Sequence, residues 1–113
     1  MIHNVYDVQI TDEAEDDLRD IYEYFSFKQQ EPKLARKIYK QIINKFNTLE
    51  KMPFRYPVYQ EEPWKSREVR QIFAGNYCGF YFVTENIVKV IRILYGGMDI
   101  NAALSETEFN DFD

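Results

Sequence analysis

Residues 67–99 read REVRQIFAGNYCGFYFVTENIVKVIRILYGGMD and decide the fold of this chain. The segment divides into three runs rich in β-branched and aromatic residues, separated by the turn pairs Gly75-Asn76 and Glu85-Asn86. Because loops this short join antiparallel neighbours, the runs predict a three-stranded meander that ends at Gly96-Gly97. The last run, 87–95, is almost entirely apolar, which favours a central place in the sheet.

Two arginines, Arg70 and Arg92, lie inside these apolar runs. A guanidinium group stays charged, so each must reach solvent, a carboxylate or a ligand. In one interpretation each arginine pairs with a carboxylate such as Glu68 or Asp99 and fixes the strand register. In the other they form a cationic spot on the open face of the sheet, able to hold a phosphate or an acidic partner residue. We expect both side chains to point outward, away from the helices.

The segment before the meander predicts a strand and a helical hairpin. Residues 5–10 alternate between apolar and polar side chains, as in a half-buried strand. Thr11 can cap a first helix, whose apolar positions are Ala14, Leu18, Ile21, Tyr22 and Phe25. Pro32 can begin a second helix, which Pro53 ends and whose apolar positions are Ala35, Ile38, Tyr39, Ile42, Phe46 and Leu49. The order β-α-α-β-β-β predicts an α+β fold, with an antiparallel meander sheet and the hairpin packed on one face.

The predicted helices leave the other face of that sheet without apolar cover. Strand alternation places Val88, Val90, Arg92 and Leu94 on one side, and Ile93 with Tyr95 on the other, unless a bulge intervenes. One helix pair cannot cover apolar residues on both sides. Residues 52–64 contain three prolines and predict an irregular loop, and residues 101–106 predict one helical turn. We therefore expect the isolated chain to expose an apolar groove that a partner covers.

Composition narrows the class of protein. The chain has 113 residues, which predicts one domain over 1–113 with an acidic tail at about 107–113. Its single cysteine, Cys78, excludes an internal disulfide, fits a reducing compartment and is expected to be a buried, inert thiol. Neither a secretion signal nor a membrane span is present in the sequence, so a cytoplasmic location is expected.

Charge is unevenly placed along the chain. The net charge of −5 disfavours broad binding to nucleic acid but leaves room for a local basic site. Acidic residues crowd the first predicted helix and basic residues crowd the second. The two blocks either complement each other across the hairpin or form separate solvated faces, and exposed ion pairs contribute little in any case.

Few residues offer catalytic chemistry. His3 is the only histidine and lies near the N-terminus, so we expect no histidine-based acid, base or metal site, and no cofactor motif occurs. The remaining candidates are cations, a tyrosine and an aspartate: Lys65, Arg67, Arg70, Arg92, Tyr95 and Asp99.

A set of residues in both halves of the chain carries a family resemblance. They are Asp17-Leu18, Ile21-Tyr22 and Tyr24 in the first helix, Ala35, Leu49 and Pro53 in and after the second, and Arg70, Gly75-Asn76-Tyr77, Tyr81, Ile91, Ile93-Leu94 and Asp99 in the meander. In this order and spacing, from Tyr6 to Leu104, the chain resembles the RelE/ParE superfamily of toxins from bacterial type II toxin–antitoxin pairs. The resemblance implies a cytoplasmic growth inhibitor of the plasmid-stabilisation kind, held inactive in a hetero-oligomer by a cognate antitoxin.

The resemblance leaves three functions open. ParE-like members bind DNA gyrase without catalysis of their own, RelE-like members cut messenger RNA on the ribosome, and a detoxified member would survive as a binding module. Ribonuclease members usually carry a basic residue where this chain has Cys78-Gly79, and a histidine or arginine in the final turn, where it has Tyr95 to Asp99. One positioned acid or base speeds a reaction roughly 10²- to 10⁴-fold. The absence of these basic residues therefore favours the interpretation that the chain binds gyrase without catalysis.

Two sets of site residues follow from the resemblance. If the chain were a ribonuclease, the catalytic residues would be Arg70, Arg92 and Tyr95, with Lys65 and Arg67 in support. For target binding, the resemblance points to Lys65, Arg67, Arg70 and Asp99.

Overall fold

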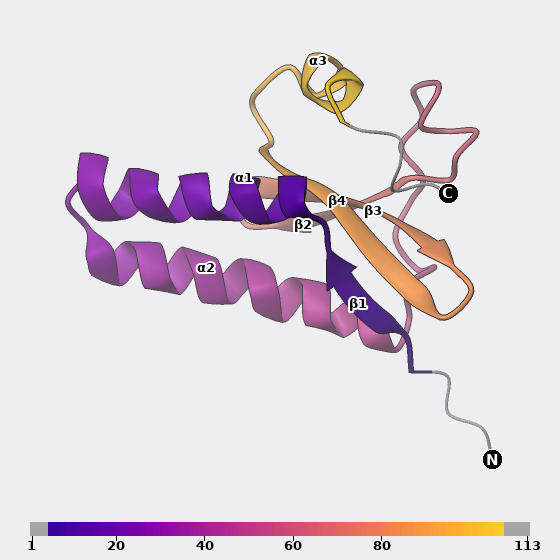
Figure 1. Ribbon diagram of the computed structural model, residues 1–113, viewed down its shortest axis with the longest axis horizontal. Coiled ribbons are helices and arrows are strands. Elements are labelled where there is room, and N and C mark those ends of the chain that lie inside the picture. The colour runs from indigo at the N-terminus through magenta and orange to yellow at the C-terminus, as the bar shows by residue number, and fades with distance from the viewer. Residues whose placement is uncertain (1–4, 108–113) are drawn as a thin grey trace.

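The computed structural model describes residues 5–107, and its elements follow the predicted order (Figure 1). They are β1 (Asp7–Ile10), α1 (Asp12–Glu23) with a π-helical extension η1 (Tyr24–Lys28), α2 (Pro32–Asn47) with a 3₁₀ turn η2 (Thr48–Glu50), β2 (Arg70–Ala74), β3 (Tyr77–Thr84), β4 (Ile87–Tyr95) and α3 (Ile100–Ser105). Met1–Asn4, with His3, lie outside the described residues. So do residues 108–113, which hold nearly all of the predicted acidic tail.

The four strands form one sheet in the order β1-β4-β3-β2. The meander is antiparallel as predicted, and the α+β fold class is confirmed. The sheet as a whole is mixed, because β1 pairs in parallel with β4 at its far edge. This pairing makes β4 a central strand, as its apolar sequence predicted.

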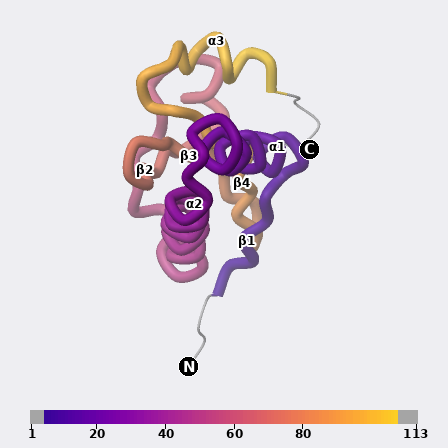
Figure 2. Tube along the Cα trace, turned by 90° about the vertical axis from the view of Figure 1, so that its left-hand side faces the viewer, coloured from indigo at the N-terminus to yellow at the C-terminus, as the bar shows by residue number. Residues whose placement is uncertain are grey.

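Short-range sequence signals determine where the two helices of the hairpin begin. The Thr11 side chain accepts a hydrogen bond from the Ala14 amide at 3.3 Å and so caps α1, and Pro32 stands at the start of α2. The helices pack side by side on one face of the sheet, and their loop end extends beyond the strands (Figures 1 and 2). Phe46 of α2 packs directly on β3, since a Cβ added at Gly79 would lie 2.3 Å from its ring.

Segments of the chain itself cover the second face of the sheet. Trp64 and Val69 of the linker, together with Ala103 and Leu104 of α3, form a second apolar cluster, whose sheet members are Cys78, Phe80, Phe82, Ile91 and Leu94. The expected apolar groove on this face is therefore wrong. Sequence periodicity could not show that an irregular, proline-containing loop would bury its tryptophan against strands.

A β-bulge in β4 changes which side chains share a face. Phe80 of β3 pairs with Arg92 and the next residue, Tyr81, pairs with Val90, which leaves one extra residue, Ile91, in β4. As a result Ile93 joins the cluster under the helices, and Leu94 lies on the opposite face. The expectation that Leu94 shares a face with Val90 is wrong for this reason.

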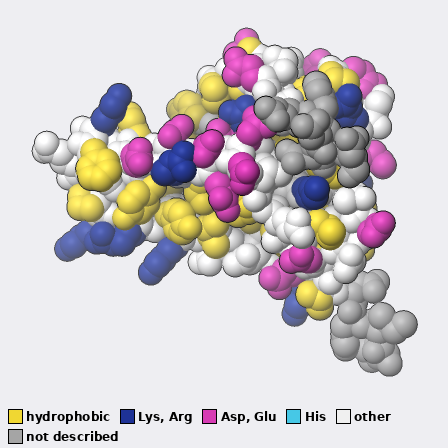
Figure 3. Space-filling model, viewed as in Figure 1, with side chains coloured by type: hydrophobic (Ala, Val, Ile, Leu, Met, Phe, Trp, Pro, Cys, Tyr) yellow, Lys and Arg dark blue, Asp and Glu magenta, His cyan; other side chains and the backbone are white. Residues whose placement is uncertain are grey.

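The charged blocks on the two helices remain separate. Figure 3 shows acidic side chains gathered over α1, basic ones along the edge formed by α2, and apolar side chains in the seam between them. None of the α2 lysines or arginines forms an ion pair with a described carboxylate. Within residues 5–107, no helix is both long and apolar enough to cross a membrane.

Candidate functional site

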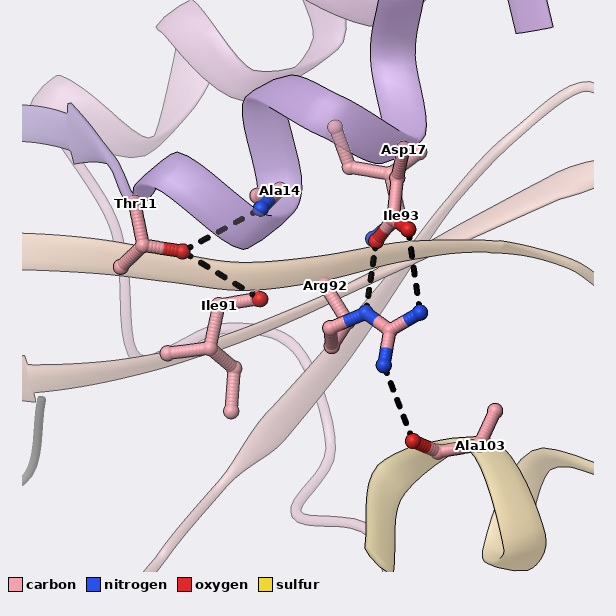
Figure 4. A network of polar contacts seen from close by, with 7 residues as sticks. All are labelled: Thr11, Ala14, Asp17, Ile91, Arg92, Ile93 and Ala103. Carbon is pink, nitrogen blue, oxygen red and sulfur yellow. Dashed lines mark hydrogen bonds and ion pairs between the residues drawn. The ribbon is translucent and has the colours of Figure 1, made fainter. Parts of the chain in front are cut away.

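Arg92 lies between three elements and is bound by each neighbour (Figure 4). Its Nε donates to one carboxylate oxygen of Asp17 on α1 at 2.7 Å, and its Nη2 donates to the other at 3.0 Å. Its Nη1 donates to the carbonyl of Ala103 in α3 at 2.9 Å. Asp17 also accepts the amide proton of Ile93 at 2.9 Å. The bidentate ion pair with Asp17 therefore holds α1 against β4, and the bond to the Ala103 carbonyl holds α3 against it.

The expected outward position of Arg92 is wrong. Its side chain is 13% exposed and that of Asp17 is 15% exposed. The hydrogen bond that the guanidinium donates to Asp17 raises its pKa further, against the opposing effect of burial. The bulge at Ile91 places Arg92 on the face of Phe80 and Leu94, away from the core under the helices. The side chain is nevertheless buried there, because Asp17 of α1 and the Ala103 carbonyl of α3 both bind it.

Arg70 lies on the edge strand β2, two strands from Arg92 and nearly level with it. It begins β2, and its Nη1 donates to the backbone carbonyls of Phe54 at 3.1 Å and Tyr56 at 2.7 Å. Its guanidinium carbon lies 5.3 Å from the centre of the Phe54 ring, a cation–π distance. Neither Glu68 nor Asp99 forms an ion pair with it. Arg70 is half-buried against the linker, away from the carboxylates that the sequence suggested.

Two more cations join Arg70 at this corner, which we call the cationic corner: Lys45, Arg55, Tyr56 and Arg70. The Arg55 side chain donates to the Tyr56 hydroxyl at 3.0 Å and lies over its ring, and Lys45 Nζ is 5.8 Å from that ring. Burial raises the pKa of Tyr56, but hydrogen bonds from Arg55 and Thr48 and the charge of Lys45 outweigh it and lower the pKa. None of the three cations forms an ion pair with a described carboxylate.

The other candidates lie on different parts of the surface. Lys65 and Arg67 are exposed on the turns before β2. Asp99 accepts the Ala102 amide at 3.2 Å and so caps α3. Tyr95 ends β4 and packs edge-on against Tyr77, with ring centres 6.0 Å apart.

The three residues of the ribonuclease interpretation do not converge. Arg70 and Ala74 are the first and last residues of β2, and Ala74 is level with Tyr95 two strands away. Four strand residues span about 13 Å and two strand spacings about 10 Å, so the Cα atoms of Arg70 and Tyr95 lie about 16 Å apart. Between them, Arg92 is bound by Asp17.

Comparison with known proteins then gives the family. The family model described as "ParE toxin of type II toxin-antitoxin system, parDE" matches residues 8–100. This chain belongs to the ParE toxin family. A search of curated proteins gave no match.

Two solved structures share the fold of this toxin. One is described as the chromosomal ParDE toxin–antitoxin system of P. aeruginosa, with a TM-score of 0.66, 20% identity, and coverage of 81% of this chain and 97% of the other. The second is the RelBE2 toxin–antitoxin complex of Mycobacterium tuberculosis, with a TM-score of 0.56, 18% identity, and coverage of 80% and 98%. The resemblance to the RelE/ParE superfamily is confirmed by the family match and these structures together.

Sequence reasoning missed part of the toxin's cationic corner. Arg55 and Tyr56 stand between Pro53 and Pro57, in a stretch treated only as an irregular loop. An adjacent basic and aromatic residue, fixed on both sides by prolines, was the available signal. Lys45 carried no such signal, because its position beside Tyr56 depends on how the linker folds back on α2.

Proposed function

We propose that this ParE-family toxin inhibits growth by binding a protein target without catalysing a reaction. From the family, the target is DNA gyrase, and a cognate antitoxin neutralises the toxin. One observation carries the non-catalytic part of the proposal, namely the separation of Arg70, Arg92 and Tyr95. A reaction on RNA needs its acid, base and phosphate-binding groups within hydrogen-bond reach of one scissile bond. Here Arg92 is engaged by Asp17, and the Cα atoms of Arg70 and Tyr95 lie about 16 Å apart on strands two apart in the sheet.

The direct test is a supercoiling assay with purified gyrase and toxin. We expect supercoiling to fall as toxin is added, and messenger RNA on ribosomes to remain intact under the same conditions. Undiminished supercoiling at a large excess of folded toxin would exclude gyrase as the target. Ribosome-dependent cleavage would exclude the non-catalytic mechanism.

The proposed target contacts are Lys65, Arg67, Arg70 and Asp99. Lys65 is the most direct probe, because it is an exposed lysine on a turn and its side chain forms no hydrogen bond or ion pair with a described residue. Lys65→Glu should weaken gyrase inhibition and leave the urea midpoint unchanged. Lys37→Glu on exposed α2 makes the same charge change away from the proposed contacts and is the matched control. Equal inhibition by both variants would remove Lys65 from the contact surface.

The cationic corner favours a second candidate function, ribosome-dependent cleavage of messenger RNA. Arg55 and Lys45 lower the pKa of Tyr56, and Arg70 stands on the same corner, a grouping that can bind phosphate and transfer a proton. If this function is correct, Tyr56→Phe should abolish cleavage without unfolding the toxin. Intact transcripts with the unmodified toxin would reject it.

A further inference from the structure

An aromatic pocket lies where Tyr77 and Tyr95, at one end of the sheet, meet the helical hairpin. Its volume is about 550 Å³, and it is lined by Asp20, Ile21, Tyr24, Phe25, Gln29, Tyr77 and Tyr95. All but Gln29 come from α1, η1, β3 and β4. This volume is enough for a side chain and part of the backbone that carries it.

The rings of the pocket are held in place by specific contacts. Tyr77 and Tyr95 meet edge-on at 6.0 Å, Tyr24 and Phe25 meet edge-on at 5.1 Å, and Gln29 donates to the Tyr24 hydroxyl at 3.0 Å. Burial, with Tyr24 and Tyr95 nearby, raises the pKa of Tyr77 and keeps its hydroxyl protonated. These groups form a preset, neutral aromatic wall.

Two features of the backbone bear on the position of these rings. The π-helical segment η1 extends α1 from Tyr24 and supplies the Tyr24 and Phe25 rings of the pocket. Gly97 lies against the Tyr95 ring, and a Cβ there would lie 2.6 Å from it. Any larger residue at position 97 would displace the ring from its place in the pocket.

The charge of the pocket selects a cation. Asp20 supplies a carboxylate that makes no ion pair with a described residue, because the neighbouring Arg19 is bound to Asp16 at 2.6 Å. The lining contains neither lysine nor arginine. Several aromatic faces beside one carboxylate bind ammonium and guanidinium groups through cation–π attraction and a charge-assisted hydrogen bond.

We infer that this pocket binds an arginine side chain of the antitoxin. Arginine is favoured over lysine because its planar guanidinium stacks on aromatic rings and still donates to a carboxylate. A peptide partner is favoured because both similar structures are toxin–antitoxin systems, and the choice of antitoxin rests on the proposed function. The pocket itself requires neither gyrase nor RNA.

The test uses the isolated toxin and two small probes of matched shape. N-acetyl-arginine amide is titrated while the NMR signals of the tyrosine rings are followed, and N-acetyl-citrulline amide, its uncharged counterpart, is the control. We expect saturable shifts at Tyr24, Tyr77 and Tyr95 at millimolar concentration, with citrulline binding at least fivefold more weakly. Equal binding of the two probes, or shifts confined to other residues, would overturn the inference.

Variants then locate the site. Asp20→Asn should weaken arginine binding about threefold, and Tyr95→Leu should abolish it. Gly97→Ala keeps every ring but moves Tyr95, so it should also weaken binding. Tyr39→Leu is the matched control, since Tyr39 is 42% exposed against 54% for Tyr95 and lies outside this pocket. An equal loss of binding in Tyr39→Leu would refute the assignment.

Two further measurements separate lost binding from lost folding and test the choice of arginine over lysine. A urea midpoint for each variant shows that lost binding is not lost folding, which we expect because Asp20 and Tyr95 are exposed. N-acetyl-lysine amide tests the choice of cation, and binding as tight as arginine would overturn it. None of these outcomes bears on gyrase inhibition, so failure here leaves the proposed function intact.

Discussion

The ion pair between Asp17 and Arg92 gives the sharpest prediction about what holds this fold together. Asp17→Asn keeps the size of the side chain but removes the charge that Arg92 faces. Arg92 would retain its bond to the Ala103 carbonyl and lose its counter-ion in a site where only 13% of its side chain is exposed. Breaking a buried pair by removing one partner costs about 3–5 kcal/mol. Because both groups keep some contact with water, we expect the free energy of unfolding to fall by about 3 kcal/mol.

The assay is urea unfolding followed by circular dichroism, with the unfolding slope compared between proteins. Asp16→Asn is the matched control, one residue earlier on the same helix, where the pair with Arg19 is 59% and 60% exposed. That variant should leave the midpoint unchanged. A second test combines Asp17→Leu with Arg92→Met, which removes both charges together. The double variant should be more stable than the sum of the single effects predicts, by about 2 kcal/mol. Additive effects, or equal midpoints for Asp17→Asn and Asp16→Asn, would refute the reasoning.

Three further variants test other parts of the structure. Gly79→Ala should lower the free energy of unfolding by about 2 kcal/mol or more, because the new methyl group would collide with the ring of Phe46, and Phe46→Leu in the same chain should restore part of the loss in urea unfolding. Thr11→Ala should cost about 1 kcal/mol, since it removes both the α1 cap and a bond to the Ile91 carbonyl at 3.3 Å, and thermal unfolding would detect it. Burial raises the pKa of Cys78 from near 9 to about 12, so the unfolded chain loses the thiol proton first. The stabilising contribution is complete below about pH 8.5 and falls as the pH rises toward 12. Cys78→Ala should therefore show a shallower loss of stability between pH 9 and 11 in urea melts.

The parts of the fold that were predictable from sequence are those with local causes. Thr11 and Pro32 mark helix starts through a side-chain cap and a fixed backbone angle, and both act within one turn of the chain. The turn pairs at 75–76 and 85–86 fix antiparallel neighbours by loop length alone. Each of these signals is complete within a few residues, so one sequence is enough to interpret it.

The parts that could not be predicted depend on contacts between distant residues. The bulge at Ile91 has no glycine or proline to mark it, and it reverses the facing of every residue after it. Trp64 is buried only because the linker folds over the sheet, which no periodic pattern records. Asp17 and Arg92 are 75 positions apart, and in the sequence Asp17 is one of many acids on a solvated helix.

The ion pair also decides where function can reside. A guanidinium inside an apolar strand had two interpretations, a ligand site or an internal ion pair, and the bonds from Arg92 to Asp17 and to the Ala103 carbonyl make it internal. Binding must then be done by residues that the fold leaves unsatisfied. The cationic corner around Arg70 holds cations that form no ion pair with a described carboxylate, and the aromatic pocket around Tyr95 holds a carboxylate that forms no ion pair with a described cation. With about 16 Å between those two residues and opposite charge preferences, a segment held in the pocket need not touch the corner. Neutralisation by an antitoxin and engagement of a target can therefore use separate surfaces of the same small domain. An antitoxin fragment confined to the pocket would bind the toxin and leave the corner open to its own ligand.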